Sequence, residues 1–228
     1  MEVNFETEIP EEIEGKLVRR KVSYLNSFFN LRSSAQILQV YERISCGAKE
    51  ISEGMAMRER VREIVLQEPM EYTLLDLCSG NGLIPIIAIF TLPLKEAIAS
   101  DKNPHEHNYF LVRNFKYWKL DLYDKKAVKE TLQKIQGPII LTSMHPCKVL
   151  AQKVIEIYQN FTKIKHVILC PCCPGHHPNL KMVEEKEEEF NQNHYDRWAL
   201  TLNRKLRGMI ERDTKMISPR NIFLHGSR

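Results

Sequence analysis

Apolar residues recur along the chain in short blocks separated by longer amphipathic stretches. From residue 72 onward, the short blocks that predict strands are 72–77, 97–100, 119–122, 138–142, 166–170 and 221–224. The amphipathic stretches that predict helices are 83–91, 103–117, 124–135, 147–160 and 197–209. Regular alternation of buried strands with helices predicts an α/β fold, with a doubly wound, mainly parallel sheet that is covered on both faces.

The first part of the chain has a different pattern. It is polar, and apolar residues recur at helical spacing around 37–44 and again around 61–65, where Pro69 ends the second helix. No Gly/Ser-rich linker follows. We therefore expect a helical N-terminal extension over residues 1–70, packed on a single domain over residues 71–228.

Composition narrows the class of protein without naming a function. The chain has 228 residues, 43% hydrophobic and 27% charged, with a net charge of +4. This size allows one large core, and the weak positive charge permits nucleic-acid binding without requiring it. No apolar run approaches the roughly 20 residues of a membrane helix, and the acidic N-terminus lacks the apolar stretch of a signal peptide. We expect a soluble, cytoplasmic protein.

The segment Leu74–Gly82, with the sequence LLDLCSGNG, is the most informative motif. It joins a buried strand to an apolar helix through a glycine-rich loop. Glycine tolerates positive φ and lets the main chain approach a ligand, while the following helix start offers unpaired N–H groups. The loop therefore predicts a site for a nucleotide-like ligand.

Carboxylates at later strand ends fit the same ligand. Asp101 lies 19 residues after Gly82, near the spacing of an acid that accepts ribose hydroxyls, and Asp121 follows one strand later. The predicted cofactor-binding residues are Asp76, Cys78, Ser79, Gly80, Asn81, Gly82, Asp101, Lys102, Asp121, Leu122 and Ser143.

Two kinds of nucleotide-binding site have a glycine-rich loop after the first strand. A hydride-transfer site requires G-x-G-x-x-G, but Pro85 occupies the position of the third glycine. The pattern Asp76-x-Cys78-x-Gly80-x-Gly82 instead resembles the first motif of class I S-adenosylmethionine-dependent methyltransferases, with Cys78 in place of the usual first glycine. The resemblance implies a Rossmann-like fold, S-adenosyl-L-methionine as cofactor, Asp101 at the ribose and Asp121 at the adenine.

Histidine and cysteine residues follow the fourth and fifth predicted strands of the domain. The fourth ends in TSMHPC, with His145 and Cys147, and the fifth in LCPCCPGHH, with Cys172, Cys173 and His176. This pairing resembles a methyltransferase branch that includes the tRNA 2′-O-methyltransferase Trm13 and the methyltransferase-like 25 proteins. The chain lacks the N-terminal Cys/His zinc modules of Trm13, because Cys46 is the only cysteine before the domain.

Three interpretations of these side chains remain open. In the preferred one, His145, Cys147, Cys172 and Cys173 line the acceptor pocket as catalytic groups, with His145 as a general base or orienting group and no metal. In the second, Cys147, Cys172, Cys173 and His176 hold zinc, although adjacent cysteines and two prolines restrict the geometry. In the third, the prolines shape a rigid turn and the thiols are small buried groups.

The sequence gives weaker information about the acceptor. Between Gly137 and His177 the only carboxylate is Glu156, which favours a hydroxyl or thiol acceptor over an amine. Arg19 and Arg20 lie near aromatic residues, an arrangement that suits RNA but is equally typical of a solvated helix face.

We expect a methyltransferase of RNA modification, with His176, Arg19 and Arg20 as substrate-binding residues and tRNA ribose 2′-O-methylation within tRNA processing as the sharpest form. The alternatives are an enzyme acting on a small molecule or protein side chain, and a non-catalytic S-adenosylmethionine-binding partner subunit.

Overall fold

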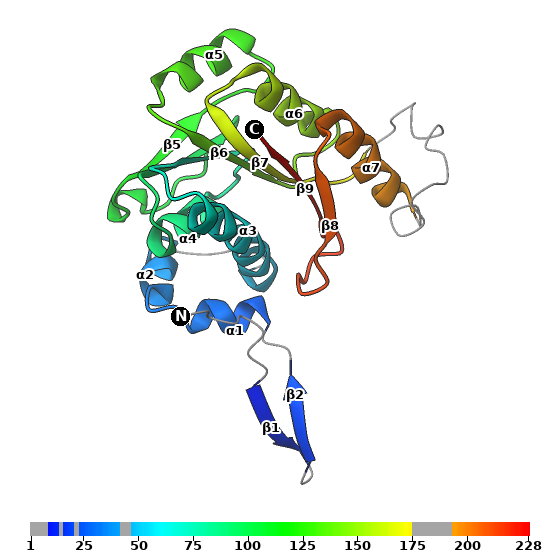
Figure 1. Ribbon diagram of the computed structural model, residues 1–228. Helices are drawn as coiled ribbons and strands as arrows, with labels where there is room; N and C mark the ends of the chain where they lie inside the picture. Colours follow the sequence, from blue (N-terminus) through cyan, green and yellow to red (C-terminus); the bar gives the residue numbers. More distant parts are fainter. Residues whose placement is uncertain (1–8, 14–15, 21–22, 42–46, 175–192) are drawn as a thin grey trace.

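A seven-stranded sheet forms the centre of the computed structural model (Figure 1). Its strands are β3 (Thr73–Leu77), β4 (Glu96–Asp101), β5 (Phe115–Lys119), β6 (Ile139–Met144), β7 (Ile164–Cys170), β8 (Met209–Arg212) and β9 (Ile222–Ser227). The structure describes residues 23–41, 47–174 and 193–228, together with the backbone of 9–13 and 16–20.

The strand order is β5-β4-β3-β6-β7-β9-β8. The five strands from β5 to β7 run parallel, and β9 is antiparallel to both of its neighbours. The prediction of a doubly wound, mainly parallel sheet is therefore confirmed.

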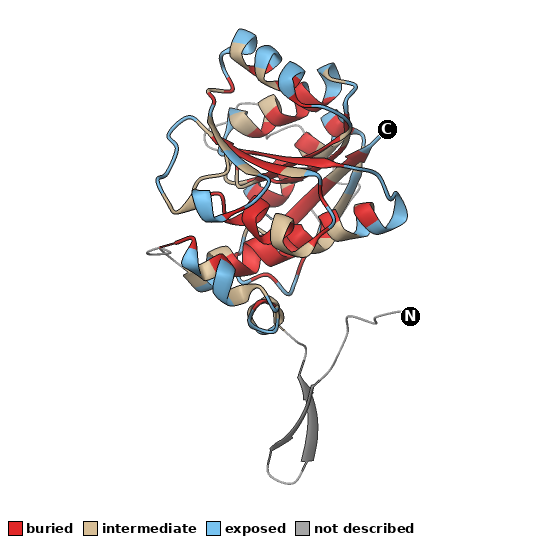
Figure 2. Cartoon of the chain, turned by 90° about the vertical axis from the view of Figure 1, so that its left-hand side faces the viewer, coloured by how far each residue is buried: buried red, intermediate tan, exposed pale blue. Residues whose placement is uncertain are grey.

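Helices cover both faces of the sheet, as Figure 1 shows. On one face lie α3 (Gly47–Gln67) and α4 (Leu83–Thr91), which pack with Leu74, Ile140 and Ile168. On the other lie α5 (Lys125–Lys134), α6 (Val149–Asn160) and α7 (His194–Leu206), which pack with Leu75, Leu141 and other residues of the opposite sheet face. The buried residues of Figure 2 concentrate in the sheet and the inner faces of these helices.

The sheet is built outward from β3 in both directions. The chain continues from β3 to β4 and β5 on one side, then crosses back to β6 on the other. This reversal of strand order opens a crevice at the carboxyl ends of β3 and β6, where ligands bind in open α/β sheets. Asp76 lies at this point, in register with Ala99 of β4 and Thr142 of β6.

The N-terminal region is helical only in part. Besides α3 it contains α1 (Tyr24–Phe29), α2 (Ser34–Gln39) and an antiparallel hairpin of β1 (Ile9–Ile13) and β2 (Lys16–Arg20). The hairpin was not predicted. Helix α3 contacts α4, β6 and β7, so it belongs to the layer that covers the sheet. The division of the chain at residue 70 stays a prediction.

The predicted helix over 103–117 and strand over 119–122 are wrong. That stretch holds a short 3-10 helix, η1 (Tyr109–Leu111), followed by β5. Phe115 and Tyr117 alternate with Lys116 along β5, a period that suits a half-buried edge strand, whereas Asn103-Pro104 imitates a helix start.

The last predicted helix, 197–209, ends earlier than expected. Arg207 closes α7 in the left-handed conformation, and β8 begins two residues later at Met209. Within the described ranges, no helix has both the length and the apolar character that crossing a bilayer requires.

Candidate cofactor and acceptor site

The glycine-rich loop after β3 takes alternating left-handed conformations. Cys78, Gly80 and Gly82 have φ of 57°, 55° and 74°. A Cβ at Gly82 would lie 3.4 Å from the ring of Phe115, whereas a Cβ at Gly80 would meet nothing within 4 Å. Gly82 is therefore needed for packing as well as conformation, and Gly80 leaves the main chain open to a ligand.

Tyrosine hydroxyls hold the loop from the side of β5. Tyr117 donates a hydrogen bond to the carbonyl of Gly80, and Tyr109 donates to the carbonyl of Asn81 at 2.8 Å. The Asn81 amide in turn donates to Glu50 of α3 at 2.8 Å. These contacts fix the loop between β5 and α3.

Asp76 is the buried carboxylate beneath the loop. It is fully buried and accepts hydrogen bonds from Ser79 Oγ at 2.5 Å and Thr142 Oγ1 at 2.7 Å. Burial raises the pKa of Asp76 to about 7, although both hydroxyls oppose the shift. Because its oxygens are occupied by the loop and β6, Asp76 shapes the site from within.

The two later acids differ in their surroundings. Asp101, at the end of β4, accepts hydrogen bonds from the backbone N–H groups of Gly80 at 3.2 Å and Asn103 at 3.0 Å. A carboxylate has further lone pairs, so Asp101 keeps the capacity to accept ribose hydroxyls. Asp121 forms an ion pair with Lys102 at 2.9 Å, and the Lys102 hydrogen bond lowers the pKa of Asp121.

A cavity of about 360 Å³ lies over the carboxyl ends of β3 and β6. Its walls come from α3, the glycine-rich loop, the segment after β4 and the end of β6. The lining residues are Glu50, Glu53, Asp76, Cys78, Ser79, Gly80, Asn81, Leu83, Ile84, His105, His107, Met144 and His145. Asp76 and the loop residues 78–81 thus share one cavity with His145, whereas the predicted Gly82, Asp101, Lys102 and Asp121 are not among the residues that line it.

His145 is held by a carboxylate from α3. Its Nε2 lies 2.8 Å from Glu53 Oε1 and 3.4 Å from Ser218 Oγ. Burial raises the pKa of Glu53, but the hydrogen bonds and charges of His145 and Lys49 together outweigh burial, and the net shift of the pKa is downward. A carboxylate can only accept, so this contact places a proton on Nε2 and leaves Nδ1 as the basic nitrogen.

The backbone around His145 is constrained. His145 has a φ of 56°, unusual for a residue with a side chain, and its N–H donates to the carbonyl of Cys170 at 2.7 Å. Its Nδ1 is enclosed and has no hydrogen-bond partner among the described residues. An acceptor group therefore reaches this nitrogen only if neighbouring side chains move aside.

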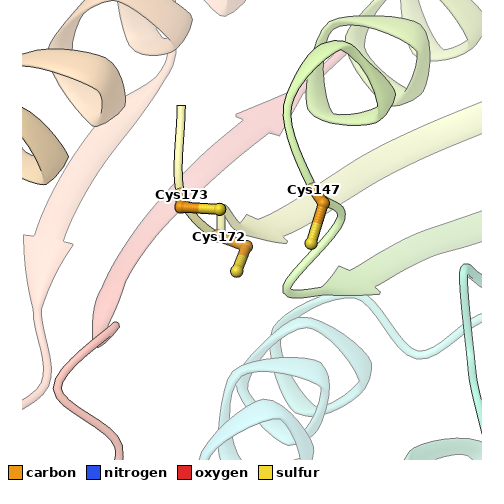
Figure 3. A group of neighbouring side chains, drawn as sticks. All are labelled: Cys147, Cys172 and Cys173. Carbon is orange, nitrogen blue, oxygen red and sulfur yellow. The ribbon is translucent and has the colours of Figure 1, made fainter. Parts of the chain in front are cut away.

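Cys147, Cys172 and Cys173 gather beside the cavity and not in its wall. Their sulfur atoms lie within 4.8 Å of one another, Cys147 is exposed, and the other two are half-buried (Figure 3). Burial and the neighbouring thiol of Cys147 raise the pKa of Cys172 to about 11. The catalytic role predicted for these cysteines stays a prediction.

Other predicted residues lie apart from the cavity. Leu122 is buried in the core, and Ser143 donates a hydrogen bond to the carbonyl of Leu77 at 2.6 Å. Arg19 and Arg20 belong to β2, where they pair with Pro10 and Ile9, and their side chains lie outside the described part. His176 also lies outside the described residues.

Several lining residues were missed by sequence reasoning. Glu50 and Glu53 stand one turn apart on α3, a pair of acids that an ordinary solvated helix also shows. His105 and His107 were assigned to a helix that does not form. The His107 ring is centred 4.8 Å from that of Tyr41 and 5.6 Å from that of Tyr109, and the His105 ring stacks on His107 at 6.2 Å. The Asn103-Pro104 dipeptide, which resembles a helix start, is equally typical of a turn, and that second interpretation could have indicated the loop that carries both histidines.

Comparison with known proteins gives likenesses of structure alone. No family model and no curated protein matches the chain. Similar solved structures include the ribosomal protein L11 methylase of Lactobacillus delbrueckii subsp. bulgaricus, at 16% identity and a TM-score of 0.44, covering 78% of each chain. The plantazolicin methyltransferase BpumL in complex with SAH has 11% identity and a TM-score of 0.49, covering 90% of this chain and 95% of its own.

A fibrillarin/Nop5p complex is a further likeness, with 14% identity, a TM-score of 0.48 and coverage of 76% of this chain and 82% of its own. At these identities the likeness concerns the course of the backbone. The case for a function therefore rests on the site.

Proposed function

We propose that the protein is an S-adenosyl-L-methionine-dependent methyltransferase that acts on RNA, with a tRNA ribose 2′-hydroxyl as the sharpest form of the acceptor. The observation that carries the proposal is the meeting of the Asp76–Gly82 loop with His145 in one cavity at the reversal of strand order. The glycine-rich loop and the histidine proposed to handle the proton therefore line the same cavity.

The residues around the loop fit the cofactor. The open space over Gly80 admits a methionine moiety against the main chain, and Asp101 offers acceptor lone pairs to ribose hydroxyls. Asp121 is the proposed hydrogen-bond acceptor for the adenine amino group. Binding of adenine would weaken the ion pair that Asp121 forms with Lys102. The bound cofactor supplies an electrophilic methyl group activated by a sulfonium.

The chain's own part in the reaction is alignment and proton handling. Methyl transfer depends chiefly on holding the acceptor in line with the methyl group and excluding water. A ribose hydroxyl has a high pKa and needs a base, and His145 is the proposed base or orienting group. Glu53 supports it by fixing the ring and stabilising the charge that develops when Nδ1 takes a proton.

The choice of RNA is supported by the surroundings of the cavity. His105 and His107 provide aromatic faces at its edge, where a base can stack. The carboxylates in the described lining are Glu50, Glu53 and Asp76. Each already has a hydrogen-bond partner, since Glu50 accepts from Asn81, Glu53 contacts His145, and Asp76 accepts from two hydroxyls, so the lining favours a hydroxyl over a guanidinium acceptor.

The test is incubation of the full chain with methyl-labelled cofactor and separate pools of total tRNA, total protein and small metabolites. The expected result is label in the tRNA pool. The phosphodiester bond that follows the labelled ribose should resist alkaline cleavage, because its 2′-hydroxyl is methylated. His145→Ala should lower labelling by about a hundredfold or more while leaving the affinity for S-adenosylhomocysteine within about twofold.

The alternatives give distinct outcomes in the same experiment. Label only in protein or in metabolites would replace RNA by that substrate class. Calorimetric binding of the cofactor with no label in any pool would favour a non-catalytic binding subunit. If the wild type did not bind the cofactor, and the Asp101→Ala variant gave the same result, the proposal would be overturned entirely.

A further inference from the structure

We propose that Cys147, Cys172 and Cys173 form a binding site for one Zn²⁺ ion, with three thiolate ligands and a fourth position open to solvent. The three residues lie next to the cofactor cavity, and none of them is part of its wall. The proposal does not rest on methyl transfer, and its test needs no activity measurement.

The distances between the sulfur atoms suit a metal ion. All three lie within 4.8 Å of one another. In a tetrahedral site with Zn–S bonds near 2.3 Å, sulfur atoms stand roughly 3.8 Å apart, so closure requires shifts of about 1 Å or less at each thiol. Figure 3 shows the thiols gathered between the loop after β6 and the loop after β7.

The two loops are already tied to each other by their backbones. Lys148 N–H donates to the carbonyl of Cys173 at 3.1 Å, and Cys172 N–H approaches the carbonyl of Pro146 at 3.5 Å. Binding would therefore require little ordering of the chain. This coupling of the loops removes much of the entropy cost of bringing three ligands together.

The residues on both sides of Cys147 have unfavourable backbone conformations. His145 and Lys148 have φ of 56° and 52°, in the left-handed region. Such conformations cost about 1–3 kcal/mol each and persist where the surroundings impose them. The Cys147 thiol lies 3.7 Å from the carbonyl of His145 in its own loop and within 4.8 Å of the two thiols of the other loop, so it can turn from the carbonyl to a metal ion.

The chemistry of the ligand set selects the kind of ion. Thiolates are soft ligands that favour zinc over the hard cations magnesium and calcium. Three thiols make an odd set, so one disulfide would leave a thiol over, whereas a single ion uses all three. Because Cys147 is exposed, the fourth position is open to water. On binding, each thiol loses its proton to solvent and no electron is transferred.

The test measures metal directly in the full chain, purified under reducing conditions from zinc-supplemented cells. Elemental analysis should give about one zinc per chain. After removal of zinc with a chelator, titration with Co²⁺ should produce the thiolate-to-cobalt absorption of a sulfur-rich site. Cys147→Ser should weaken zinc binding by more than about tenfold. Loss of a residue that only hydrogen-bonds to a metal ligand already lowers metal affinity about 10- to 100-fold, and Cys147 is itself a proposed ligand.

The matched control is Cys78→Ser, which removes the half-buried thiol at the glycine-rich loop and should keep the zinc content of the wild type. Cys147 is exposed, so its serine variant should fold, as a thermal melt can confirm. Two results would overturn the proposal: no stoichiometric zinc or cobalt binding by the reduced chain, or unchanged zinc content in the variant with all three cysteines replaced by serine.

Discussion

Asp76 shows how a residue that is easy to place in the sequence acquires its properties from distant partners. Its position at the end of the first buried strand was predicted from the apolar run before it. Its ionisation depends on burial and on Thr142, which lies 66 residues later and reaches it only because β6 is the neighbour of β3. The sequence predicts the carboxylate, and the fold determines its charge.

The raised pKa of Asp76 gives a pH dependence of stability. The pKa of about 7 means that folded Asp76 holds its proton up to about pH 7, whereas in the unfolded chain it loses the proton near the usual pKa of 3.8. The folded state is therefore favoured below about pH 4, and that advantage is lost as the pH rises toward 7. Asp76→Asn, which stays neutral, should be more stable than the wild type at pH 8, by up to about 4 kcal/mol.

Urea unfolding at pH 5 and pH 8 checks this prediction, with the exposed Asp124→Asn as the control for removing a carboxylate. An equal difference between wild type and Asp76→Asn at both pH values would contradict it.

Glu53 is a positioning residue under the proposed function. Glu53→Gln keeps the shape and an acceptor oxygen but removes the charge beside His145, so turnover should fall by about 10- to 100-fold with S-adenosylhomocysteine affinity unchanged. The pH–rate profile and the ¹⁵N shifts of the His145 ring separate this effect from a loss of structure. Lys49→Met, which removes the exposed partner of Glu53 at 3.1 Å, should leave turnover nearly unaltered.

At the scale of elements, the sequence predicted best where apolar runs were long. The helix over 83–91 matches α4 residue for residue, because a continuous apolar run between two loops leaves few alternatives. The prediction from the sequence failed at β5, because its residues are partly exposed and form no continuous apolar run. It also failed at β8, because four residues are too few to show a period. Edge strands gain their stability from pairing, which a local pattern does not report.

The contact between α3 and α4 permits a test of packing. A Cβ at Gly54 would lie 2.7 Å from Ile87 Cδ1, so Gly54→Ala must displace that atom. Ile87→Val removes the clashing methyl group. In the Ile87→Val background, Gly54→Ala should become stabilising by up to about 1 kcal/mol, since alanine favours a helix over glycine by that amount.

Chemical denaturation of the four proteins of this double-mutant cycle gives the coupling energy. A coupling of zero would mean that Ile87 Cδ1 does not limit the approach of the two helices.

At the scale of the whole molecule, an ionic network with a buried centre at Arg60 and Asp213 joins the N-terminal helices to the C-terminal hairpin of β8 and β9. Arg60 of α3 pairs with Glu211 at 2.5 Å and Asp213 at 3.0 Å, and its guanidinium lies 3.6 Å from the centre of the Phe223 ring. Tyr24 donates to Asp213 at 2.6 Å. No local pattern in the sequence predicts contacts across some 150 residues, so this network emerged only from the structure.

Loss of Arg60 should be costly because Asp213 would remain buried without its cation. Arg60→Met is expected to destabilise the fold by about 3–5 kcal/mol, and the added change Asp213→Asn should recover part of that loss. Thermal and urea unfolding of the single and double variants provide the measurement. A double variant no more stable than Arg60→Met would show that the unpaired charge is not the source of the cost.

The arrangement around His145 also has a consequence during synthesis on the ribosome. Glu53 precedes His145 by 92 residues, and Ser218 follows it by 73. A growing polypeptide can pair the imidazole with its carboxylate long before the serine has been translated. Nascent chains halted before residue 218 should therefore lack the serine beside the histidine, and ligand capture by such intermediates should lag behind formation of the central strands.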